Sequence, residues 1–87
     1  MDNQFNFCRV CGLFHEDAPW GESGTYPTFN ICECCGVEFG YEDVSVNSVK
    51  AYRNKWLSLG SIWFSIKFKP SNWNIDEQLK NIPTCFK

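Results

Sequence analysis

The sequence predicts an α+β fold: a small zinc-ribbon-like domain with two cysteine knuckles and short antiparallel strands, followed by one longer and one short helix. Two C-x2-C pairs, each followed by glycine, lie in the first half of the chain. Apolar and polar residues alternate around these pairs, as in half-buried strands, and the apolar spacing becomes helical after residue 45. With 87 residues we expect one domain (1–87), in which a helical, aromatic-rich half (44–87) packs on a zinc-ribbon half (1–43).

The strands are expected on both sides of the knuckles. Phe5 and Phe7 alternate with polar residues before the first cysteine pair. Residues 26–33 and 37–41 alternate in the same way around the second pair. The intervening residues 15–25 are rich in glycine and acids and predict an exposed loop.

The longer helix is expected at residues 46–59. Its predicted inner face follows helical spacing, i, i+3, i+4, i+7 and i+8. This face comprises Val49, Tyr52, Arg53, Trp56 and Leu57. Ser45 or Ser48 is placed to cap the start, and Gly60 is placed to end the helix in the left-handed conformation.

A short second helix is expected near residues 75–82. Asn74 with Glu77 three residues later forms a capping pattern. Leu79 and Ile82 would face inward, and Pro83 would stop the helix. We expect one core of aromatic side chains, made of Phe29, Phe39, Tyr52, Trp56, Trp63, Phe64 and Trp73.

The two cysteine pairs predict one structural zinc ion. Cys8, Cys11, Cys32 and Cys35 are the expected ligands, because a two-residue gap lets a tight turn aim both sulfurs at one ion. The glycines after each pair permit the turn to close. Iron in a rubredoxin-like site is the alternative metal. Cys34 is an alternative to Cys35 as a ligand, and Cys35 is preferred because glycine follows it.

Two other side chains are expected to have no role in the metal site. His15 is expected at the surface of its loop, and Cys85 is expected to be a small buried apolar residue. A closed site of four thiolates performs no Lewis-acid chemistry, and no Ser/His/Asp or Cys/His set is placed to come together. We therefore expect no enzymatic activity.

Charge is distributed unevenly and suggests a protein partner. Residues 1–43 carry eight acidic side chains and one basic, whereas residues 44–87 carry two acidic and seven basic. The loop at 15–24 combines acids with an aromatic residue, which suits a basic protein partner. The expected partner-binding residues are Glu16, Asp17, Trp20 and Glu22.

Nucleic-acid binding is the alternative. Basic residues interleaved with aromatic rings in the second half would suit phosphate contact and base stacking. These bases are Lys50, Arg53, Lys55, Lys67 and Lys69. The sequence pI of about 5.2 disfavours this role.

The first residues contain no basic segment followed by an apolar one, and no apolar run is long enough to cross a membrane. We therefore expect a cytoplasmic protein without membrane contact, whose thiols stay reduced.

Residues 29–43, FNICECCGVEFGYED, resemble the bacterial cysteine-rich CPCC proteins. The similarity continues through PWGESG, YRNKW and NWNIDEQLKNIP. Glu33 and Arg9 stand where that family commonly has proline. The resemblance implies a small zinc-binding protein of a bacterium or phage. It also implies an immunity role, in which such a protein blocks a toxin by occupying its surface.

Overall fold

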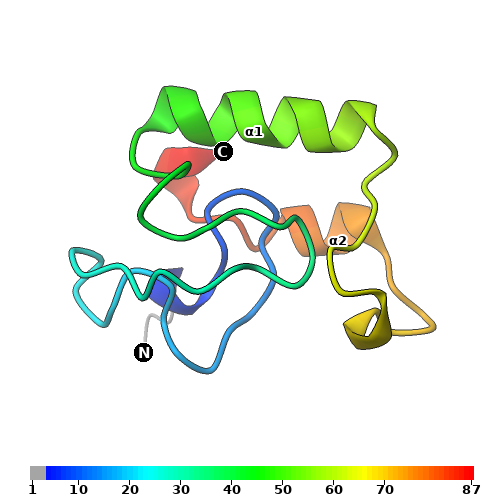
Figure 1. The fold of residues 1–87 in the computed structure, drawn as a ribbon, viewed down its shortest axis with the longest axis horizontal. Helices are drawn as coiled ribbons and strands as arrows, with labels where there is room; N and C mark the ends of the chain where they lie inside the picture. Colours follow the sequence, from blue (N-terminus) through cyan, green and yellow to red (C-terminus); the bar gives the residue numbers. More distant parts are fainter. Residues whose placement is uncertain (1–3) are drawn as a thin grey trace.

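The computed structural model describes residues 4–87 and contains two α-helices and three short 3-10 helices. In chain order they are η1 (Gln4–Asn6), α1 (Val46–Ser58), η2 (Ile66–Phe68), α2 (Ile75–Leu79) and η3 (Thr84–Phe86). Helix α1 lies along one edge of the molecule, over the loops formed by the first half of the chain (Figure 1). The C-terminal η3 lies under α1 and contacts it.

The described residues contain no β-strand, so the predicted α+β fold with antiparallel strands is wrong. Only two isolated antiparallel bridges form, Phe7 with Phe14 and Ile31 with Glu38, one across each knuckle. The chain leaves the extended conformation soon after each contact. Phe29 has a φ of 62° and Gly40 a φ of 93°. The two segments joined by the bridge of Ile31 with Glu38 therefore leave the extended conformation two residues beyond it. The alternation of apolar residues therefore reflects packing around the knuckles rather than a sheet.

Helix α1 confirms the helix predicted in the second half to within one residue. The Ser45 side chain accepts the Ser48 backbone N–H at 3.1 Å, as an N-cap does. At the other end, Gly60 has a φ of 101° and the Ser61 N–H donates to the Trp56 carbonyl at 3.0 Å. This is a Schellman arrangement, and it confirms the left-handed helix end that was predicted from the glycine.

Helix α2 begins as predicted but ends early. Asn74 Oδ1 accepts the Glu77 N–H at 3.1 Å, and the helix stops at Leu79. Ile82 is buried, as expected. The buried side chain of the helix itself is Gln78, whereas the expected Leu79 is only partly covered.

The core is built from cysteines as much as from rings. Five cysteines are buried beside Val10, Val37, Phe39, Val49, Trp56 and Trp63. Tyr52 and Trp73 pack against this cluster, as predicted. The prediction is wrong for Phe29 and Phe64, which are 61% and 63% exposed. Neither of the two α-helices among residues 4–87 is long and apolar enough to cross a membrane.

Candidate metal centre

The two cysteine knuckles share one backbone conformation. In the first, the Cys8 N–H donates to the Leu13 carbonyl at 2.9 Å and the Gly12 N–H donates to the Cys8 carbonyl at 3.0 Å. The second repeats both bonds from Cys32 and Gly36, at 2.9 Å each. The two glycines have φ values of 83° and 80°, which an L side chain rarely adopts. Each knuckle is therefore a turn that glycine closes.

These turns bring four buried sulfurs together. The Sγ atoms of Cys8, Cys11, Cys32 and Cys35 all lie within 4.8 Å of one another. Sγ of Cys8 is 3.7 Å from that of Cys35, and Sγ of Cys11 is 3.6 Å from that of Cys32. A disulfide needs about 2.05 Å, so these cysteines are free. A tetrahedron with metal–sulfur bonds of about 2.3 Å has edges of about 3.8 Å, so the group can hold a metal ion.

The electrostatics of the four sulfurs also favour a bound cation. Burial raises the pKa of the Cys11 and Cys35 thiols, whereas hydrogen bonds from neighbouring cysteines, chiefly Cys11, lower the pKa of Cys32. Without a cation, burial therefore opposes the loss of protons from Cys11 and Cys35. A divalent ion would compensate the charge of four thiolates at once.

Two further hydrogen bonds support the knuckles, one to a ligand sulfur and one to a ligand's backbone carbonyl. The Val10 N–H donates to Cys8 Sγ at 3.4 Å. The Tyr52 hydroxyl of α1 donates to the Cys35 carbonyl at 3.1 Å. Burial, followed by the charge of Cys35, raises the pKa of Tyr52 to about 12, so this hydroxyl keeps its proton at neutral pH.

Cys34 lies outside the group of four sulfurs but is fully buried beside it. Gln78 Nε2 donates to Cys34 Sγ at 3.3 Å and to the Cys11 carbonyl at 3.1 Å. The Trp73 indole N–H donates to Gln78 Oε1 at 2.7 Å. Gln78 thus joins α2 to both knuckles. Sequence reasoning missed it, because a glutamine on a short helix is usually exposed.

Comparison with known proteins gives one relative. The uncharacterised protein YoaQ of Bacillus subtilis (strain 168) is 33% identical over 97 aligned positions, which cover 92% of this chain and 75% of YoaQ. This chain belongs to the YoaQ family. No family model matches the chain, and no solved structure matches it. YoaQ is itself uncharacterised, so the similarity assigns no activity to this chain.

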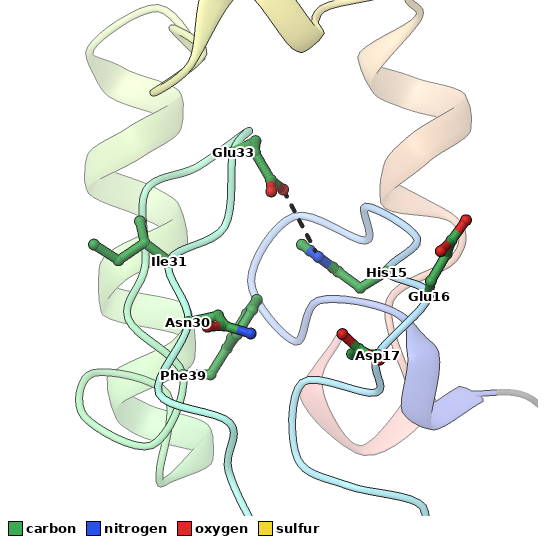
Figure 2. Close-up of a pocket in the computed structure, with 7 residues that line it drawn as sticks. All are labelled: His15, Glu16, Asp17, Asn30, Ile31, Glu33 and Phe39. Atoms are coloured by element: carbon green, nitrogen blue, oxygen red, sulfur yellow. Dashed lines mark ion pairs between the residues drawn. The ribbon is translucent and has the colours of Figure 1, made fainter.

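His15 was predicted to lie at the surface of its loop, but its side chain is largely enclosed. Its side chain is 13% exposed, its ring meets Phe39 edge-on at 5.1 Å, and its Nδ1 lies 3.8 Å from Glu33 Oε2 (Figure 2). His15 lines a hollow with a volume of about 320 Å³, and Glu16 and Asp17 line it too. Two of the acids predicted to bind a partner therefore lie near His15, and both are exposed.

Trp20 is not an exposed aromatic anchor. Its indole N–H donates to Asp43 Oδ2 at 2.8 Å, and the Arg9 guanidinium lies 3.9 Å from the centre of its ring. Its neighbour Glu22 is exposed. Trp20 holds the acidic loop to the knuckles, so the acidic loop lacks the apolar contact that the sequence predicted for it.

The predicted nucleic-acid residues are only partly available. Arg53 donates to the backbone carbonyls of Val10 at 2.7 Å and Arg9 at 2.9 Å, and also to that of Phe86. Its guanidinium is therefore used within the fold and is not free for phosphate. The other four predicted bases are exposed, namely Lys50, Lys55, Lys67 and Lys69.

Cys85 is also exposed, contrary to expectation.

Proposed function

We propose that this chain is a non-enzymatic zinc protein in which one structural Zn²⁺ fixes the fold, and that it acts by binding another protein. The proposed zinc ligands are Cys8, Cys11, Cys32 and Cys35. The observation that carries the proposal is the spacing of their four sulfurs, which matches the edges of a zinc–thiolate tetrahedron.

A structural role for the metal follows from the donor set. Four thiolates fill a tetrahedral site and leave no position for water or substrate. The ligands come from two turns that no sheet joins, since only isolated bridges form among residues 4–87. The metal would therefore supply the cross-link between the turns.

Zinc is favoured over iron for a site whose role is structural. Thiolate ligands suit both metals, and zinc takes no part in redox chemistry. The two are distinguished by mass and by colour, because a zinc–thiolate site does not absorb visible light.

Protein binding is supported by the apolar side chains that the fold leaves on its surface. Toxin neutralisation stays a narrower prediction, carried by the CPCC resemblance. It would require a toxin encoded beside this gene and a tight complex with that toxin.

Native mass spectrometry of the protein purified from its own host, with and without a chelator, tests the proposal. We expect one zinc ion per chain and a co-purified protein. A folded chain without metal would contradict the zinc site. A co-purified oligonucleotide in place of a protein would contradict the protein-binding role.

A further inference from the structure

Five large apolar side chains are exposed within one short segment after α1. They are 56% to 67% exposed and are flanked by two exposed lysines. We call this group the 59–69 surface: Leu59, Ile62, Phe64, Ile66, Lys67, Phe68 and Lys69. It lies around η2, at the opposite end of the molecule from the segment near residue 25 (Figure 1).

The 59–69 surface is held against the metal centre. The Phe64 N–H donates to the Cys34 carbonyl at 3.0 Å, and the Ser65 N–H donates to the Glu33 carbonyl at 2.8 Å. The Trp56 indole N–H donates to the Ile62 carbonyl at 2.9 Å. Trp63, inside the same segment, is buried. The fold therefore anchors this segment through one tryptophan while presenting its apolar neighbours to the outside.

A hollow borders the surface at Leu59. Its volume is about 280 Å³, and it lies between α1 and the second knuckle. The other residues that line it are Cys35, Glu42, Tyr52, Lys55 and Trp56. The hollow offers a recess for an apolar side chain of a partner, next to a ligand of the metal.

Basic side chains outnumber acidic ones around the surface, where Glu42 lines the adjoining recess. Residues 44–75 contain no acidic side chain and five basic ones. Lys55, Lys67 and Lys69 are exposed there. The acids of the adjoining knuckle have other contacts. Glu33 points to His15 (Figure 2), and Glu42 Oε1 accepts the Glu38 N–H at 3.4 Å.

We infer that the 59–69 surface binds an acidic, amphipathic segment of a partner protein. Apolar side chains of that segment would cover Ile66 and Phe68 and fill the recess at Leu59, and its carboxylates would lie near the lysines. This inference rests on the proposed protein-binding function. The acidic loop predicted a basic partner, whereas the 59–69 surface lies in the basic half of the chain and suits an acidic one.

The surface suits a protein better than nucleic acid or a bilayer. Three of its five apolar side chains, Leu59, Ile62 and Ile66, are aliphatic and offer no ring on which a base could stack, which leaves Phe64 and Phe68 as the aromatic positions. The recess at Leu59 also favours a protein, because a folded or folding segment can place one apolar side chain into it.

Selection from a phage-displayed library of random linear peptides, on the full zinc-loaded chain, tests the inference. We expect the selected peptides to be rich in acidic and large apolar residues. Ile66→Ser with Phe68→Ser, and separately Lys67→Glu with Lys69→Glu, should each weaken their binding at least about tenfold. Lys80→Glu with Lys87→Glu, both outside the 59–69 surface, is the charge-matched control, and Glu16→Gln with Asp17→Asn is the control for the acidic loop. All these residues are exposed, so each variant should keep its zinc and helical content.

Each contrary result has a distinct meaning. Basic peptides whose binding is lost only in the Glu16→Gln, Asp17→Asn variant would overturn this surface but keep the protein-binding function. No enriched peptide, together with binding to phosphatidylserine-containing vesicles or to a random single-stranded oligonucleotide, would overturn both. A chain without zinc would contradict the proposed metal site before any peptide is selected.

Discussion

At the scale of single residues, Asp43 shows how one buried carboxylate organises the acidic loop. It is fully buried. Its Oδ2 accepts the Trp20 indole N–H and its Oδ1 accepts the Gly40 N–H, both at 2.8 Å. Its backbone carbonyl accepts from Arg9 Nη1 at 3.0 Å. Hydrogen bonds to a charged acceptor each contribute about 1.5–3 kcal/mol to stability, so this one side chain fixes Trp20 and the turn at Gly40.

We predict that Asp43→Asn lowers the free energy of unfolding by about 2 kcal/mol. The amide keeps one oxygen acceptor. Its NH₂ group would take the place of the second carboxylate oxygen and would face an N–H group, so that one hydrogen bond is lost and two donors meet. Urea denaturation of the zinc-loaded protein measures the change. Asp17→Asn, at an exposed position, should leave the stability unchanged. Equal midpoints for the two variants would show that the buried contacts contribute little.

At the scale of elements, the knuckle glycines have the same conformation but different neighbours. A Cβ on Gly12 would collide with the backbone carbonyl of Gln78, which α2 holds in place. A Cβ on Gly36 would lie 3.1 Å from the Phe64 ring, and that ring is exposed and can move. Both positions carry the strain of a positive φ, about 1–2 kcal/mol for an L residue. The first glycine therefore also allows α2 to approach the metal centre.

We predict that Gly12→Ala destabilises the protein by about 1–3 kcal/mol more than Gly36→Ala, the typical cost of overpacking. Gly60→Ala is the control for backbone strain, since its Cβ would meet no atom closer than 3.9 Å. Denaturation midpoints of the three variants, each loaded with one zinc, give the comparison. If Gly12→Ala matched Gly60→Ala, α2 would have to be free to move away.

At the scale of the whole molecule, the cysteines take the place that a sheet or a larger apolar core has in other domains. Among residues 4–87, the twelve buried hydrophobic residues other than proline include five cysteines, and one cross-link would tie residues 8–11 to residues 32–35. Structural zinc contributes about 10–16 kcal/mol in small domains. The net stability of a folded domain is about 5–15 kcal/mol, so loss of the metal should remove most of it.

We predict that a chelator unfolds the protein and abolishes the helical circular dichroism of α1. Serine in place of any one of Cys8, Cys11, Cys32 or Cys35 should prevent stable folding in the same way. Cys85→Ser, at an exposed position, should leave metal content and helicity unchanged. A chain that stays helical after its zinc is removed would show that the apolar core suffices.

Features that depend on neighbours along the chain were predictable from the sequence. Each knuckle needs a two-residue gap and a following glycine, and each helix cap needs a polar side chain three residues before its donor. Such patterns are visible locally, which is why α1, its left-handed end at Gly60 and the cap at Asn74 were predicted. The two-residue alternation was local too, but it also fits packing around turns, and the strands predicted from it were wrong.

Contacts between side chains that are distant along the chain depend on the tertiary structure. Gln78 reaches the Cys11 carbonyl over 67 positions, and Trp20 reaches Asp43 over 23. No local pattern encodes these pairs, because a buried polar group is stable only beside a partner that distant segments supply. For the same reason Phe64 was predicted in the core and lies outside it, since Trp63 fills the interior beside it.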